Sequence, residues 1–376
     1  MFKSGVEDLL GFVNALGLLR DWVGEYVSMD SVDLSEGGFG FEVSSEGVGV
    51  RRVVGEGCSG VGVFGLDSQS SLVRFENADV FVVTGALVGS GVHFVPGFAG
   101  VHWLGLRFRF KVDGGLVKLF EDRVGEFVLV RSRFVDRVFD GSYSDEAIRD
   151  EIRNEVETGL VGVFKSLVEE GSVSSGLGNA LLLVDGPIFS TPRVISLPNN
   201  RPYYDLYWAL IKRSVEAVRG VRAVGVVKRV GQSMFYAKYK GLPVDDDTLI
   251  KNEVRRQFSN EPGLRVVIGP LEVRVRGVVN GEDLEFVKYC WYVASRLGRD
   301  LNVVRVEALD PELAELGAYC VARYVGLDGV PLPIFIADKL SRRLNAGFVR
   351  LLASLSPLEL TYEGLEVVSK VLSGVV

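Results

Sequence analysis

The chain contains very little histidine, and this shortage excludes several kinds of active site. Its 376 residues include only two histidines, His93 and His102. A zinc site built on imidazoles or a Ser–His–Asp triad needs correctly placed histidines, so the sequence disfavours both. Any chemistry of this chain is therefore expected to depend on carboxylates.

Cysteine is also scarce, and long apolar runs are missing. Cys58, Cys290 and Cys320 lie far apart without a CxxC pair, and their odd number leaves at least one unpaired in any disulfide scheme. This pattern favours reduced thiols and a cytoplasmic location. No stretch of about 18 uninterrupted apolar residues occurs, so we expect no membrane span. The sequence also lacks a GxxxxGK[ST] phosphate loop.

The composition is that of a globular protein with a large core. Hydrophobic residues make up 47% of the chain, which at this length predicts one core with an appendage. The formal charge of −7 argues against a surface that is basic overall. It leaves room for a local basic groove, so nucleic acid is not excluded as a partner.

Two apolar segments each lead into an aspartate. In Val61–Leu72 the apolar residues precede Asp67, and Ala180–Val184 precedes Asp185. A buried carboxylate is costly unless it is paired, and a divalent cation is a common partner that also performs chemistry. Alternation of strand and helix beyond Asp185 predicts parallel neighbours, with Lys228 at the carboxyl end of the next strand. The sequence thus predicts a shared site at these strand ends.

A long amphipathic helix is predicted over Asp145–Glu169. Of its acids, Glu155 lies closest to the apolar stripe at 100° per residue, and Glu151 and Glu157 lie further round. Glu155 could point at the sheet, or it could belong to a solvated flank of the helix. Both interpretations stay open on the pattern alone.

Basic residues occur in two further candidate positions. Leu106–Val112 alternates basic and apolar residues, so a strand there would place Arg107 and Arg109 on one face, which suits DNA or an ordinary exposed surface. A late helix over Phe335–Leu352 carries Asp338 near its start and Arg342 one turn later. Asp338 could satisfy the helix dipole or serve as another ligand.

The remaining segments complete the expected architecture. An amphipathic helix at the N-terminus packs on the core or contacts a partner, and short strands follow it up to Val54. Leu264–Ile268 and Leu271–Val275 are predicted to form a hairpin around Gly269–Pro270. Glu282–Leu297 is predicted to be a helix.

Taken in order, these motifs resemble those of the NurA family of DNA-end-processing nucleases over roughly residues 60–350. Asp67 matches the family's first acid, although Ser68 and Gln69 replace the glycine that usually follows it. Asp185–Gly186 matches the second strand-end motif, and Val226–Lys228 resembles the Gly-x-x-Lys turn. Ala337–Asp338 stands where the family typically has an Ala–His pair.

The resemblance implies an α/β fold, a ribonuclease-H-like mixed sheet flanked by helices with an N-terminal helical and β extension. We expect this extension over residues 1–58 as a dimer or partner contact. The nuclease core would span 59–356 with a β-rich insertion near 90–140, and a C-terminal helix would cover 357–376.

The resemblance also implies the activity and the site. We expect a 5′→3′ exonuclease on single- and double-stranded DNA, with single-strand endonuclease activity, that resects ends in double-strand break repair by homologous recombination. The expected partners are DNA, a second copy of the chain and a HerA-type hexameric ATPase, which would supply the missing motor. Two Mn²⁺ or Mg²⁺ ions would serve the hydrolysis. The expected metal ligands are Asp67, Glu155, Asp185 and Asp338, and the expected DNA phosphate contacts are Lys228, Arg107, Arg109 and Arg342.

Two other hypotheses remain. The substitutions after Asp67 and at Asp338 would also suit a catalytically decayed DNA-binding or scaffolding subunit of the same complex. A resolvase or transposase of the same fold would cut branched DNA instead of shortening ends.

Overall fold

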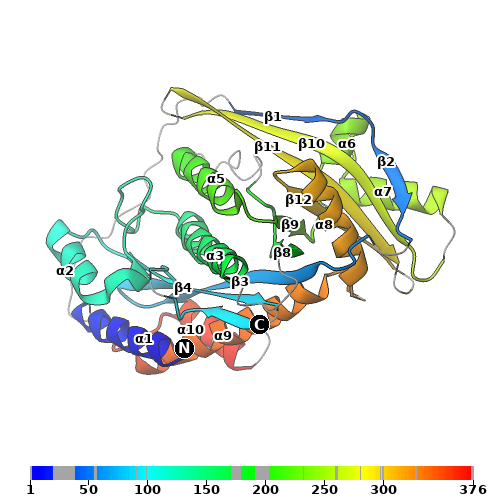
Figure 1. Cartoon of the computed structure of the whole chain (residues 1–376). Helices are drawn as coiled ribbons and strands as arrows, with labels where there is room; N and C mark the ends of the chain where they lie inside the picture. The colour runs from blue at the N-terminus through cyan, green and yellow to red at the C-terminus, as the bar shows by residue number, and fades with distance from the viewer. Residues whose placement is uncertain are drawn as a thin grey trace.

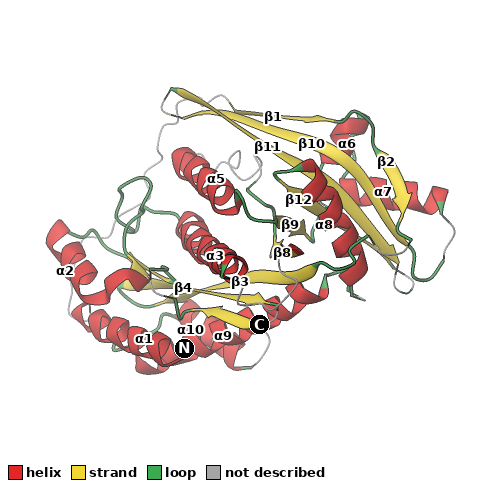
Figure 2. Ribbon diagram, viewed as in Figure 1, coloured by secondary structure: helices red, strands yellow, loops and turns green. Residues whose placement is uncertain are grey.

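Within the residues that the structure describes, twelve strands form one mixed sheet with helices packed on both of its faces (Figures 1 and 2). The structure is a computed structural model, and it describes residues 2–19, 39–54, 57–89, 91–98, 100–170, 179–190, 203–231, 233–258, 261–279, 281–296, 298, 300–326 and 328–373. The strand order is β1-β10-β11-β12-β9-β8-β3-β4-β6-β7, with β2 on β10 and β5 on β4. The expected mixed sheet flanked by helices is confirmed.

The elements have the following bounds. The strands are β1 (Phe39–Ser44), β2 (Gly49–Arg52), β3 (Gly62–Arg74), β4 (Ala78–Val88), β5 (Val92–Val95), β6 (Leu104–Phe108), β7 (Val128–Leu129), β8 (Ala180–Asp185), β9 (Ala223–Val227), β10 (Arg265–Val279), β11 (Glu282–Arg296) and β12 (Leu301–Ala308). The helices are α1 (Phe2–Leu16), α2 (Gly114–Val124), α3 (Asp145–Glu169), α5 (Tyr204–Val218), α6 (Phe235–Lys240), α7 (Asp246–Gln257), α8 (Pro311–Tyr324), α9 (Leu332–Leu355) and α10 (Tyr362–Leu372), with short 3₁₀ turns at Gly17–Leu19 and Gly125–Phe127.

Strand β3 lies in the middle of the sheet, parallel to β8 on one side and antiparallel to β4 on the other. Figure 1 shows α3 and α5 on one face of this region and α1, α9 and α10 on the other. The predicted stripe of α3 is buried at Ile148, Ile152, Val156 and Leu160. Helices therefore cover β3 on both faces. The polar residues of β3 need hydrogen-bond partners inside the protein.

Two predicted elements beyond residue 260 are wrong. The predicted hairpin of Leu264–Val275 is one continuous strand, β10, with a shift in register between Ile268 and Leu271. The predicted helix of Glu282–Leu297 is strand β11, which pairs with β10 and β12. Most of β11 from Cys290 onward is buried. Apolar side chains on both faces of a covered strand hide the alternation that would have distinguished it from a helix.

The N-terminal helix packs on the core, as one of the two interpretations predicted, and Leu9, Phe12 and Leu16 are buried. The sequence pattern predicts this helix from Val6 to about Tyr26, and its part from residue 20 onward lies outside the described residues. No described helix combines the length and the apolar character that crossing a membrane requires.

The cysteines differ from the expectation of reduced thiols. Cys58 and Cys320 form a disulfide across 262 positions of the sequence and join the segment before β3 to α8. Cys290 is the unpaired cysteine that the odd number required, and its burial raises the pKa of the thiol to about 12. The pairing could not be predicted because the fold alone brings the two distant residues together.

Candidate active site

Asp67 is the most buried carboxylate of the candidate site. Strand β3 continues seven residues beyond it, so Asp67 lies in the middle of the strand, whereas the sequence suggested a strand end. Only the parallel pairing with β8 stops there, at Leu66 and Val184. The side chain is 4% exposed, and Ser341 on α9 donates a hydrogen bond to its Oδ2 at 3.0 Å. Burial on this face makes any second charge near Asp67 energetically important.

Helix α9 can approach Asp67 because β3 carries a glycine two residues earlier. A Cβ on Gly65 would lie 2.3 Å from the backbone carbonyl of Pro333. The start of α9 therefore lies directly on β3 at this glycine. This contact fixes where Asp338 and Ser341 stand relative to Asp67.

Asp185 ends β8 and lies beside Asp67. The parallel register pairs Leu66 with Val184, so the next residues of the two strands, Asp67 and Asp185, are neighbours. Lys228, immediately after β9, places its Nζ 2.6 Å from Asp185 Oδ2. The structure brings Asp67, Asp185 and Lys228 together, as expected, although Asp67 does not lie at a strand end.

Asp338 completes the group from α9. It lies one turn before Ser341, whose hydroxyl also donates to the Asp338 backbone carbonyl at 3.0 Å. Arg342 places its Nε 2.8 Å from Asp338 Oδ1. Three carboxylates and two cations from β3, β8, β9 and α9 thus converge.

The crowding of the carboxylates has an electrostatic consequence. Burial, followed by the charge and hydrogen bond of Asp185 and the charge of Asp338, raises the pKa of Asp67 to about 8, and Lys228 opposes this shift. At neutral pH the folded protein therefore favours the protonated form of Asp67. A group that supplies positive charge would stabilise them in the ionised form.

The ligand chemistry of these three carboxylates suits a divalent cation. Asp67, Asp185 and Asp338 offer only oxygen ligands, which Mg²⁺ and Mn²⁺ prefer. In the described part of the chain, no three acids, histidines or cysteines already stand close enough to hold an ion. Lys228 and Arg342 each hold one of the carboxylates, and their side chains are 29% and 45% exposed. Both cations are therefore partly open to solvent.

Helix α3 covers the opposite face of β3. Asp67 accepts a hydrogen bond from Ser341 of α9, whereas the next residue, Ser68, donates to Glu157 of α3 at 2.5 Å. Successive residues of a strand point to opposite faces, so these two contacts lie on opposite sides of the sheet. Glu157, one of the three glutamates considered from the sequence, therefore contacts the residue next to Asp67, but on the opposite face of the sheet.

Glu155, the predicted helix ligand, is occupied by arginines. Both of its oxygens accept hydrogen bonds from Arg213, and Arg133 Nη1 lies 3.0 Å from Oε1. Glu151 accepts the backbone N–H of Arg133 at 2.7 Å, and burial raises its pKa to about 7. The structure therefore does not bring Glu155 or Glu151 to Asp67. The apolar stripe correctly predicted which side of α3 is buried. That side packs on the face of the sheet opposite to the Asp67 side chain.

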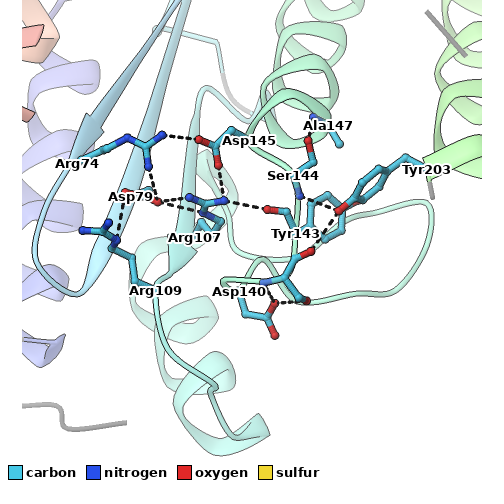
Figure 3. Close-up of polar contacts among 11 residues, drawn as sticks. Arg74, Asp79, Arg107, Arg109, Asp140, Tyr143, Ser144, Asp145, Ala147 and Tyr203 are labelled. Carbon is cyan, nitrogen blue, oxygen red and sulfur yellow. Dashed lines mark hydrogen bonds and ion pairs between the residues drawn. The ribbon is translucent and has the colours of Figure 1, made fainter. Parts of the chain in front are cut away.

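Two of the four predicted phosphate contacts lie away from the site. Arg107 is bound to the fully buried Asp79 and to Asp145, and Arg74 and Arg109 surround the same aspartate (Figure 3). Strand β6 ends before Arg109, so the predicted basic strand face does not form. Arg107 is thus paired with one fully buried carboxylate, Asp79, and one partly exposed carboxylate, Asp145. Of the four predicted cations, Lys228 and Arg342 are the two that reach the site.

Ser341 is a site residue that the sequence analysis missed. It is fully buried and joins Asp67 to α9 through one hydroxyl. The only sequence signal was its position three residues after Asp338, which places the two on neighbouring faces of a helix. A serine in an amphipathic helix is too common for that signal to be decisive.

Comparison with known proteins identifies one family. A family model described as the NurA domain matches residues 61–343, or 283 of the 376 positions. This span includes Asp67, Asp185, Lys228, Asp338 and Arg342. Among curated proteins, no sequence matches the chain.

Several solved structures are similar to this chain. The NurA nuclease from Sulfolobus solfataricus is 14% identical, with 76% of this chain and 82% of that chain covered and a TM-score of 0.38. A structure of NurA bound to dAMP and manganese is 10% identical, with 74% and 83% covered and a TM-score of 0.31. A structure of NurA with manganese is 12% identical, with 79% and 90% covered and a TM-score of 0.27.

Proposed function

The chain belongs to the NurA family, and from this membership together with the carboxylate site we propose that it is a divalent-metal-dependent nuclease. The observation that carries the proposal is the convergence of Asp67, Asp185 and Asp338 with Lys228 and Arg342. Hydrolysis of a phosphodiester requires both an activated water and neutralisation of charge on the phosphate. The site offers oxygen ligands for the first requirement and cations for the second.

In this proposal, Asp67, Asp185 and Asp338 would hold the metal. When bound, the metal supplies an activated water and positive charge at the phosphate. Ser341 orients the Asp67 carboxylate through its hydrogen bond. Lys228 and Arg342 leave their carboxylates and bind the phosphates of the substrate, as their exposure permits. The same three carboxylates would serve whether one ion or two ions bind.

We further propose DNA as the substrate, degraded 5′→3′ from single- and double-stranded ends, with single-strand endonuclease activity. The support for this proposal is membership of the NurA family. The proposed role is end resection during double-strand break repair. The proposed partners are a second copy of the chain and a HerA-type hexameric ATPase. The lack of a GxxxxGK[ST] loop in the sequence agrees with a motor supplied by another protein.

A second candidate function is a non-catalytic DNA-binding subunit of the same complex. It is favoured by Asp338 in place of the family's usual histidine, by Ser68 after Asp67, and by the ion pairs that occupy Asp185 and Asp338. These carboxylates would then stabilise the fold through Lys228 and Arg342.

A cleavage assay separates the two functions. The purified chain is incubated with end-labelled linear DNA and Mn²⁺, with EDTA as the metal-free control. The nuclease proposal expects shortening of the DNA that is lost in Asp67→Ala and Asp185→Ala. Absence of cleavage by the folded wild-type chain would instead support the non-catalytic subunit. Cutting restricted to branched DNA would indicate a resolvase.

A further inference from the structure

A cluster of buried charged residues lies under the loops that follow β8 and β9. Lys288, Glu307 and Asp246 are completely buried, and Arg305 is 3% exposed. Charges in such positions are costly unless each is paired and hydrogen-bonded. The contacts of these residues show which loops they hold in place.

Glu307 holds the loop after Asp185. It is the neighbour of Gly225 in the pairing of β12 with β9. A Cβ on Gly225 would lie 2.3 Å from the backbone nitrogen of Ile188, so only a glycine lets the loop pass this close over β9. The N–H of Ile188 then donates to Glu307 Oε2 at 3.1 Å.

A second contact fixes the same loop. Lys288 Nζ lies 2.7 Å from Glu307 Oε2 and donates to the backbone carbonyl of Phe189 at 3.2 Å. The loop is also tied at its start, where the N–H of Gly186 donates to the carbonyl of Val226 at 2.9 Å. Asp185 therefore leaves β8 in a loop that is held within four residues of it.

The other end of the cluster holds the segment after Lys228. Arg305 Nε donates to Glu307 Oε1 at 2.7 Å, and its Nη1 donates to the hydroxyl of Ser233. Ser233 in turn donates to Asp246 Oδ2 at 2.5 Å. One carboxylate, Glu307, thus connects the loop of Asp185 with the segment that follows Lys228.

We propose that Glu307 is a positioning residue that sets the place of Asp185 and Lys228 for metal binding and hydrolysis. This inference rests on the nuclease function proposed above. Glu307 does not touch the substrate, because it is fully buried. It acts through Ile188 on one loop and through Arg305 on the other.

The test compares Glu307→Gln with Asp79→Asn. Both acids are completely buried and paired with cations, so both substitutions are expected to lower the Tm. Asp79 lies seven residues along β4 from Ala86, the partner of Asp67, which is roughly 24 Å at the rise of a strand. Asp79→Asn therefore controls for the loss of stability without disturbing the site.

Three quantities are measured well below both midpoints: Mn²⁺ affinity by calorimetry, and kcat and KM on linear DNA. We expect Glu307→Gln to weaken Mn²⁺ binding or lower kcat by about 10- to 100-fold, as for other residues that orient metal ligands. KM should change much less, because Glu307 makes no contact with DNA. Asp79→Asn should leave all three quantities close to those of the wild type.

Equal effects of the two substitutions would overturn the inference and leave Glu307 with a purely structural role. If Glu307→Gln does not fold, Lys288→Met is measured by the same criteria, since it removes the contact with Phe189 and keeps the pair of Glu307 with Arg305. Failure of the nuclease proposal is separate: it would appear as a wild-type chain that does not cleave DNA. In that case the Mn²⁺ affinities of the variants still decide the role of Glu307.

Discussion

Replacing Asp67 with asparagine should stabilise the metal-free protein at alkaline pH while abolishing its nuclease activity. Asparagine has nearly the same shape as aspartate and can still accept the hydrogen bond from Ser341. What it lacks is the charge, which in the wild type is buried beside Asp185 and Asp338. The substitution therefore removes repulsion from the folded state without leaving a cavity.

The magnitude follows from the pKa. Burial and the neighbouring acids raise the pKa of Asp67 from 3.8 to about 8. A raised pKa means that the folded state favours the protonated form, so this stabilising contribution is complete below pH 3.8 and is lost as the pH rises to 8. About three of these pH units lie above pH 5, and each corresponds to 1.36 kcal/mol, or roughly 4 kcal/mol altogether. Asp67 is 4% exposed, so screening by solvent does not reduce this value.

The assay is urea unfolding in EDTA between pH 5 and pH 9. The free energy of unfolding of the wild type should fall by roughly 4 kcal/mol relative to Asp67→Asn across this range. Asp310→Asn serves as the control, because Asp310 caps α8 at the surface and asparagine is an equally good cap. Adding Mn²⁺ at pH 9 should restore stability to the wild type but not to Asp67→Asn. Parallel pH profiles for the wild type and Asp67→Asn would refute the reasoning.

Three further substitutions test the surroundings of the site. Glu151→Gln should stabilise the protein by roughly 3 kcal/mol at pH 9 and have no effect at pH 4, because burial raises the pKa of Glu151 from 4.5 to about 7; denaturant titrations at both pH values check this. Glu155→Gln should lower the Tm, because it weakens the pairs with Arg133 and Arg213, and it should retain Mn²⁺-dependent cleavage. Loss of cleavage in a folded variant would indicate that Glu155 takes part in the active site. Gly65→Ala should reduce both cleavage and Tm, since the new methyl group would meet the backbone of Pro333 at 2.3 Å. Its control, Gly162→Ala, adds a methyl group in open space on α3 and should raise stability by about 1 kcal/mol in the same thermal unfolding experiment.

Long helices with a polar face were predictable in this chain. The bounds of α3 agree with the predicted Asp145–Glu169. This helix has an N-terminal cap from Ser144 and an apolar stripe with a helical period. Local signals therefore sufficed where one face of an element meets solvent.

Strand β11 shows where local signals fail. Its residues between Cys290 and Arg296 are buried on both faces, so neither a period of two nor a period of 3.6 stands out. Its identity as a strand depends on pairing with β10 and β12, which the sequence does not display. The disulfide between Cys58 and Cys320 could not be predicted for the same reason, because only the fold brings these distant residues together.

The sequence by itself predicted a carboxylate site and the proximity of Asp67, Asp185 and Lys228. Scarce histidine disfavoured imidazole-based sites, and apolar segments that each lead into a charged residue indicated where the parallel pairing of β3 with β8 stops. The tertiary structure alone decided which helix faces Asp67. Helix phase correctly identified the buried side of α3, but phase carries no information on which face of the sheet a helix covers. Packing placed α9 on the face of Asp67 and α3 on the other, so Asp338 joined the site and Glu155 did not.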